Sequence, residues 1–299
     1  MKKITIKIFP FLVGVISLTS CVKEADMNID PGKTNSVIEF ANTGDNQAGN
    51  TSEFPRFYTD LGSIGDGESA SFNVNVNYAG GAEAPEDITV NLAIDAKSLE
   101  TYNTEDGTDY VVPATSIFSI PSSVVIKKGT RLTQVQAKIT RTSDFDFGLS
   151  YALPVKIASV SSGTISGNFG TAIYSFGVRN QYDGHYSIKG YTLRSGDAVK
   201  TGNFTDSRGI DLATVGSTSN QFGQLQPWAD LTGVGVGYPV IAVNADNSVT
   251  LTSSGGIANA PGYNSHYDPT SKTYFISFTW GAGPSARLAT DTLTYIGPR

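Results

Sequence analysis

The chain of 299 residues has a single cysteine, Cys21, so no disulfide can form within it and the fold must depend on its core. Basic residues are scarce as well, with 21 lysines and arginines against 27 aspartates and glutamates. This acidic balance argues against nucleic acid as a partner, because such binding depends on basic side chains that neutralise phosphates. It also argues against a basic patch that would bind a membrane surface.

Long apolar runs are absent after the first twenty residues, so the sequence predicts no membrane-spanning helix there. Three lysines precede a short apolar stretch at residues 8–16, and small residues then lead to Cys21. This order predicts a lipoprotein signal peptide at residues 1–20, with cleavage before Cys21 and lipidation of that cysteine. An ordinary signal peptide followed by a chance cysteine is the alternative.

Residues 21–36 are expected to be the lipidated cysteine and a flexible tether, since they show no apolar periodicity. Acidic residues close behind Cys21 are similar to the surface-export signals of Bacteroidetes lipoproteins. We therefore expect a lipid-anchored protein of the outer membrane that is exposed on the cell surface; a plain solvated tether is the alternative. Residues 1–20 hold three of the basic residues and no acids, so the remaining chain has 18 basic and 27 acidic residues, a net charge of −9.

The composition predicts an all-β protein of two domains. Glycine is abundant at 32 residues, tyrosine and phenylalanine far outnumber methionine, and few stretches favour helix. Residues 37–178 contain short segments in which apolar and polar residues alternate, typical of strands with one buried face. These segments are 71–78, 88–95, 123–126, 132–139, 151–160 and 171–178. Together with one short helix at residues 96–102, they predict a β-sandwich.

A boundary is expected near residues 179–184, and residues 182–299 should form a second, antiparallel β-meander or barrel-like domain that binds the ligand. Its expected strands are 185–193, 240–243, 248–252, 273–280 and 288–296. The segment 205–239 is rich in glycine, serine and threonine and lacks periodicity, so we expect it to be irregular.

Several short motifs of the first domain resemble a known family. They are Leu99 with Tyr102-Asn103, Gly107-Thr108 with Tyr110, Val112-Pro113, Phe118 with Ile120, Val125-Ile126 with Gly129, and the run from Tyr151 to Ile157. Their order resembles the immunoglobulin-like module called domain of unknown function 1735, found in surface lipoproteins of Bacteroidetes polysaccharide-utilisation loci. The resemblance implies an immunoglobulin-like sandwich and a role in glycan binding, and it supplies no catalytic residues.

Catalytic chemistry has weak support in the sequence. The two histidines, His185 and His266, lie far apart, and no hydrolase or phosphate-binding motif occurs. Asp144 and Asp146 are a candidate glycosidase carboxylate pair. A structural role explains them better, in which both face solvent between the buried Phe145 and Phe147. We therefore expect no enzyme activity.

No metal or cofactor is expected. Oxygen-bearing side chains gather at residues 103–109, but their spacing departs from known calcium loops and favours a polar turn after the helix. Asp246 and Asn247 are better explained as turn formers.

Aromatic residues in loops are the best candidates for ligand contact, because an exposed ring can stack on the apolar face of a sugar. The candidate binding residues are Trp228, Tyr238, Tyr263, His266 and Tyr267. Rings that cap the barrel core are the alternative for each, and alternation places Trp280 in the core.

The sequence thus favours a non-catalytic surface lipoprotein that binds an oligo- or polysaccharide, with an outer-membrane transporter as a further partner. A structural or adhesive protein, such as a fimbrial subunit or an assembly partner of an outer-membrane protein, is the alternative.

Overall fold

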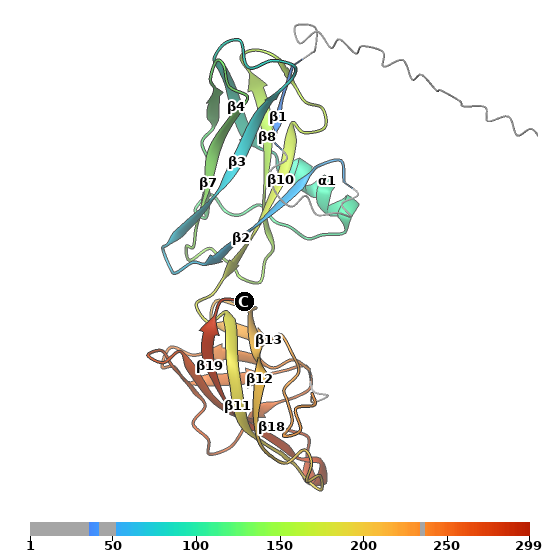
Figure 1. The fold of residues 1–299 in the computed structure, drawn as a ribbon, viewed down its shortest axis with the longest axis vertical. Helices are drawn as coiled ribbons and strands as arrows, with labels where there is room; N and C mark the ends of the chain where they lie inside the picture. The colour runs from blue at the N-terminus through green and yellow to red at the C-terminus, as the bar shows by residue number, and fades with distance from the viewer. Residues whose placement is uncertain (1–35, 42–51, 234–236) are drawn as a thin grey trace, which may run out of the picture.

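The computed structural model describes residues 36–41, 52–233 and 237–299, which form two β-domains joined end to end (Figure 1). The all-β class is confirmed, including the sandwich and the barrel-like second domain. The predicted signal peptide, Cys21 and most of the tether lie outside the described residues. None of the helices in the described part is long and apolar enough to cross a membrane.

The first domain is a sandwich of two five-stranded sheets. One sheet has the order β5 (Phe118–Ser119), β7 (Leu132–Thr140), β3 (Ser69–Ala79), β1 (Val37–Phe40) and β9 (Thr164–Ile165). The other has the order β2 (Arg56–Ser63), β10 (Thr171–Arg179), β8 (Tyr151–Val160), β4 (Ile88–Ile94) and β6 (Ser123–Ile126). The alternation predicted for residues 71–78 is confirmed, because Phe72, Val74, Val76 and Tyr78 all face the core.

The one predicted helix is confirmed as α1 (Ala96–Asp106), which runs four residues beyond the expected end. It ends at Gly107, whose φ of 64° is a left-handed conformation that favours glycine. Strand β2 was missing from the predictions because it lies at a sheet edge and buries only Phe57. A strand without a regular buried face gives no alternating signal.

The second domain is a curled antiparallel sheet whose strands form a nearly closed barrel. Its order is β15 (Val249–Thr252), β14 (Val240–Val243), β13 (Ser219–Phe222), β12 (Gly202–Thr214), β11 (Gly184–Arg194), β19 (Arg287–Gly297), β18 (Thr273–Trp280) and β16 (Ala258–Asn259). Strand β17 (His266–Asp268) also pairs with β18, and a short 3₁₀ helix, η1 (Gly283–Ser285), precedes β19. The inner face carries the second apolar core, and the predicted core position of Trp280 is confirmed.

The expectation of an irregular segment at residues 205–239 was wrong for its first half. Strand β12 reaches Thr214 and β13 follows at Ser219–Phe222. The register between β11 and β12 shifts at the point where Tyr186 pairs with Ile210 and Ile188 with Asp206. This bulge inserts extra residues and interrupts the alternation of inward and outward side chains, which hid the strand in the sequence.

The junction between the domains is held by charged side chains from both. Arg179, at the end of β10, forms an ion pair with Asp60 of the first domain and lies 3.7 Å from the carboxylate of Asp183. Asp183 is buried and accepts a 2.8 Å hydrogen bond from Arg299. It also accepts hydrogen bonds from the main chain and hydroxyl of Thr214. The connecting segment is therefore anchored to both domains.

Candidate functional site

The candidate site is built where a loop at residues 223–233 covers the long strand β12. Strand β13 pairs only with Leu212–Thr214, so the earlier part of β12 has no strand on that side. The loop fills this gap and buries Gln226, Pro227 and Trp228. A tight turn fixes its tip, since the main-chain N–H of Trp228 donates to Thr232 and that of Leu231 donates to Trp228, both at 2.8 Å. Two pockets flank this loop.

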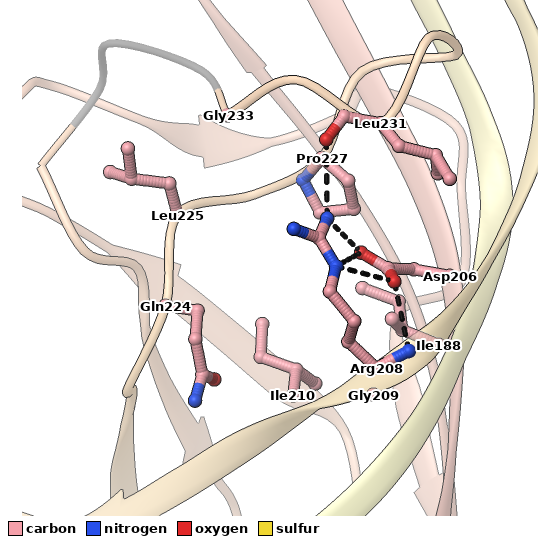
Figure 2. A pocket seen from close by; sticks show the side chains of 10 residues that line it. All are labelled: Ile188, Asp206, Arg208, Gly209, Ile210, Gln224, Leu225, Pro227, Leu231 and Gly233. Atoms are coloured by element: carbon pink, nitrogen blue, oxygen red, sulfur yellow. Dashed lines mark hydrogen bonds and ion pairs between the residues drawn. The ribbon is translucent and has the colours of Figure 1, made fainter.

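The first, which we name the side pocket, is drawn in Figure 2 and has a volume of about 280 Å³. Its wall is mostly apolar and includes Ile210 and Leu225. Arg208 lies across it, with Nη2 2.6 Å from the Asp206 carboxylate and 3.2 Å from the main-chain oxygen of Leu231. The hydrogen bond from Arg208 holds the pKa of Asp206 below its usual range. Because Arg208 is occupied in fastening the loop to β12, the side pocket offers a ligand little free polar chemistry.

The second, which we name the end pocket, is larger, at about 480 Å³. It lies at the end of the barrel where β11 and β18 finish and β19 begins, away from the first domain (Figure 1). Its lining residues are Arg194, Lys200, Trp228, Gly233, Gly255, Trp280, Gly281 and Arg287. The two tryptophan rings pack together with centroids 5.5 Å apart and form the apolar part of the wall.

Charged side chains fix the walls of the end pocket. Lys200 donates to Asp230 at 3.0 Å and to the Thr232 hydroxyl at 2.7 Å, which ties the loop to the connection between β11 and β12. The Thr232 hydroxyl and Lys200 lower the pKa of Asp230 to about 2, so Asp230 stays ionised throughout the physiological range. The Arg194 guanidinium lies over the Trp228 ring, 5.8 Å from its centroid, in a cation–π contact. The pocket therefore combines apolar rings with fixed hydrogen-bond donors.

The structure does not bring the five predicted binding residues together. Trp228 lines the end pocket, but it is 4% exposed and contributes to the pocket wall as part of the core. Tyr267 packs against Tyr182 and Tyr274 near the other end of the barrel, and its buried ring lines neither of the two pockets beside the loop. Trp280 and Tyr274 are six residues apart on β18, about 20 Å along a strand.

The other three predicted residues lie nearer to solvent. Tyr238 and Tyr263 are 46% and 40% exposed. Gly237, next to Tyr238, lies against Ser254. The loop that contains Ser254 also contributes Gly255 to the lining of the end pocket. His266 stacks on Phe275 at 5.0 Å, and its ring Nδ1 lies 2.9 Å from the main-chain oxygen of Asn264.

The polar side chains that were candidates for catalysis or metal binding already have hydrogen-bond partners within the protein. Asp144 accepts a hydrogen bond from Ser116, and Asp146 accepts one from the main chain of Gly148, as expected for exposed loop carboxylates. His185 pairs with Asp211 at 2.7 Å, far from His266 in the sequence.

The oxygen-rich segment at residues 103–109 covers the last turn of α1 and the residues after it, so the polar turn expected there begins only at Gly107. Asn103 accepts hydrogen bonds from Thr108 and Tyr110. Asp246 accepts both a main-chain and a hydroxyl hydrogen bond from Ser248, and Asn247 has a φ of 63°, which confirms the turn between β14 and β15. Among the residues that the structure describes, no group of three or more metal-ligating side chains occurs.

A further hollow lies in the first domain, with a volume of about 230 Å³. Aromatic rings dominate its lining, including Tyr110, Phe147 and the 44% exposed Tyr58. It has an apolar surface for a ligand but lacks the cluster of cationic donors that the end pocket presents.

Sequence reasoning missed Arg194, Lys200 and Arg287. Each is a charged residue that lies in a strand or next to one, and such residues usually point outward into solvent. Only the pairing of strand ends shows that Arg194, Arg287 and Trp280 lie in one row, since Arg287 is opposite both of the others. Strand alternation in β18 and β19 could have suggested an inward Arg287, but the partner strands cannot be read from the sequence.

Comparison with known proteins bears on the fold. A family model described as an N-terminal domain matches residues 35–164, less than half of the chain. No curated protein matches the chain. A Bacteroides ovatus structure of unknown function has a TM-score of 0.56 at 13% identity, over 88% of this chain and 95% of that one. The present chain therefore shares its two-domain fold along almost the whole length of that protein.

Two other similar structures come from Bacteroides. A multidomain protein of Bacteroides ovatus that includes domain of unknown function 1735 has 16% identity and a TM-score of 0.48, over 86% of this chain and 93% of that one. An auxiliary nutrient binding protein of Bacteroides thetaiotaomicron has 16% identity and a TM-score of 0.46, over 84% and 93%. The predicted resemblance of the N-terminal domain to the domain of unknown function 1735 module is confirmed.

Proposed function

We propose that this protein binds a glycan without cleaving it and that the end pocket is the binding site. The observation that carries the proposal is the composition of this pocket, in which two tryptophans adjoin three cationic side chains. Sugars have apolar ring faces and many hydroxyls, so they match a wall that combines aromatic rings with hydrogen-bond donors. The volume of about 480 Å³ is within the range of about 300–1,000 Å³ typical of small-ligand sites.

A binding role is favoured over hydrolysis by the same lining. Glycosidases act through two carboxylic groups placed about 5–10 Å apart on either side of the scissile bond. The eight described lining residues of the end pocket include no aspartate or glutamate. The nearby Asp230 is held as an anion by Lys200 and Thr232, which makes it unsuitable as a general acid.

The location of the protein belongs to the same proposal. The signal sequence supports cleavage before Cys21, lipidation of Cys21 and anchoring at the outer membrane with the two domains on the cell surface. An outer-membrane transporter is then the natural recipient of a captured glycan. Metabolic labelling with a clickable fatty acid tests the anchor: label should enter the wild-type protein and be lost in Cys21→Ser.

Intrinsic fluorescence gives a direct test of the site, because the only two tryptophans of the chain both line the end pocket. The chain from residue 22 onward, which retains every described residue, should be titrated with plant, host and microbial oligosaccharides. Calorimetry detects binding anywhere on the protein, whereas tryptophan emission reports on the end pocket. We expect a saturable heat signal and an emission change with the same dissociation constant.

The outcomes separate the site from the function. Heat of binding without any emission change would move the site elsewhere, and Tyr58→Ala would then test the aromatic hollow of the first domain. Absence of heat across the whole panel would contradict glycan binding and favour the structural or adhesive alternative.

A further inference from the structure

The charge of the end pocket contrasts with that of the chain. The protein as a whole carries a net charge of −6, yet the pocket is lined by Arg194, Lys200 and Arg287 and by no acidic residue. Two carboxylates lie just behind this lining. Asp230 neutralises Lys200 at 3.0 Å, and Asp197 lies 3.6 Å from Arg194. Among the described residues, Arg287 has no such partner, so the pocket retains an uncompensated positive charge.

The arrangement of the two arginines is unfavourable for an empty pocket. Arg194 of β11 and Arg287 of β19 are direct cross-strand partners in the antiparallel ladder. Side chains in such a pair have Cβ atoms about 4.5–5.5 Å apart, and like charges in directly opposite positions destabilise a sheet. Both side chains line the same pocket, so they share one face. An anion placed between the two guanidinium groups would remove this repulsion.

Arginine is also the side chain best suited to hold such an anion. Its planar guanidinium presents paired N–H donors that match two oxygens of a carboxylate or sulfate. The cation–π contact with Trp228 holds the Arg194 guanidinium in the pocket without a hydrogen bond to its N–H groups, which leaves these donors for a ligand. The adjacent Trp280 is opposite Arg287 on the neighbouring strand and supplies apolar surface beside the charge.

We propose that the end pocket selects acidic glycans, with a carboxylate or sulfate group of the sugar bound between Arg194 and Arg287. This inference rests on the proposed glycan-binding function and names the class of sugar. Lys200, already paired with Asp230, holds the loop and contributes to the field of the pocket.

The test compares each acidic sugar with a neutral form of the same backbone. Tetragalacturonate is titrated beside its fully methyl-esterified form, and a chondroitin sulfate tetrasaccharide beside its counterpart that lacks sulfate and has esterified carboxylates. We expect at least one acidic member to bind at least tenfold more tightly than its neutral partner, with an affinity that falls as salt rises. A difference in the galacturonate pair shows carboxylate recognition, because that pair carries no sulfate. For the chondroitin pair, unsulfated chondroitin with free carboxylates separates the two groups.

The matched variant is Arg194→Gln/Arg287→Gln, with Lys138→Gln on the exposed face of β7 as the control. The double variant should lose at least tenfold in affinity for the acidic sugar and much less for the neutral one, so that the preference for the acidic member disappears, whereas the control should match the wild type. The unfolding temperature of the double variant should stay close to that of the wild type, because relief of the repulsion offsets the lost contacts of Arg194 with Trp228 and Asp197. A loss of binding can therefore be separated from a loss of folding.

Equal binding of acidic and neutral members, or an unchanged affinity of the double variant, would overturn the acidic selectivity and leave glycan binding standing. Failure of every acidic and neutral sugar to bind would overturn both proposals.

Discussion

At the scale of single residues, Asp291 is the most unusual side chain of the barrel. It is 1% exposed on the inner face of β19, and Gly190 stands opposite it on β11. A Cβ at position 190 would lie 2.6 Å from Asp291 Oδ1, so the glycine makes room for the carboxyl group. Gln226 of the loop donates to Asp291 at 3.1 Å, but Asp291 Oδ2 has no partner. A carboxylate in this position would be costly, whereas a neutral acid is tolerated.

A pH dependence of stability follows from this burial. Burial raises the pKa of Asp291 to about 8, although the Gln226 hydrogen bond lowers it. A raised pKa means that the native state binds a proton that the unfolded chain releases. The contribution of Asp291 is therefore fully present below about pH 4 and is lost as the pH rises through about 8, at up to about 1.4 kcal/mol per pH unit.

Asp291→Asn should remove this dependence, because the amide stays neutral at every pH. We expect the variant to gain stability relative to the wild type between pH 5 and pH 8, as measured by urea unfolding at each unit of pH. Asp109→Asn, at an exposed position of the first domain, is the control. A difference between Asp291→Asn and the wild type that does not change with pH would contradict the buried neutral acid.

At the scale of elements, the barrel closes between β15 and β16, the two strands at the ends of the sheet, which hardly pair with each other. Strand β16 has only two residues, and one of them, Asn259, bridges to β15 through its side chain. Its Oδ1 accepts a hydrogen bond from Leu251 N–H at 2.8 Å, and its Nδ2 donates to the Val249 oxygen at 2.6 Å. The amide thus replaces a piece of strand and satisfies main-chain groups that would otherwise be left unpaired at the seam.

Asn259→Ala should open this seam. The loss of the partner of Leu251 N–H leaves a main-chain donor unsatisfied, at a cost of about 1–3 kcal/mol in the free energy of unfolding. Hydrogen exchange should accelerate at Leu251. Asn203→Ala, at an exposed position of β12, should change stability by less than about 0.5 kcal/mol. Unchanged exchange at Leu251 would show that the seam does not depend on the side chain.

At the scale of the whole molecule, the junction decides how the pocket is presented. The end pocket is at the far end of the second domain, so the orientation of that domain relative to the first sets the direction in which the pocket opens (Figure 1). Arg179 links the domains because it pairs with Asp60 of one and also contacts the Arg299 main-chain oxygen at 2.7 Å in the other.

Arg179→Ala should loosen this link. Since its ion pair with Asp60 is partly exposed, we expect a loss of about 1 kcal/mol or less in domain stability. The main effect should be a wider range of domain orientations, visible as a broader pair-distance distribution in small-angle X-ray scattering. Arg131→Ala, at an exposed position of the first domain just before β7, should leave the scattering curve unchanged. A scattering curve of Arg179→Ala identical to that of the wild type would contradict the bridging role.

The sequence predicted the regular parts of the fold well, because their signals are local. Strand β3 alternates strictly, and helix α1 begins where expected. Strands β2 and β12 were missed or misjudged, since an edge strand buries little and a bulge shifts the alternation. Of the five candidate ligand residues, only Trp228 lines the end pocket, and Tyr267 is in the core.

The sequence by itself determined the β-class and the strand faces, because each depends on residues that are neighbours along the chain. Only the tertiary structure decided which side chains form the end pocket. Arg194, Trp228 and Arg287 are distant in sequence and meet because the sheet curls and the loop at residues 223–233 covers the part of β12 that β13 leaves unpaired. Strand register and loop placement depend on packing across the whole barrel, and no local pattern encodes them.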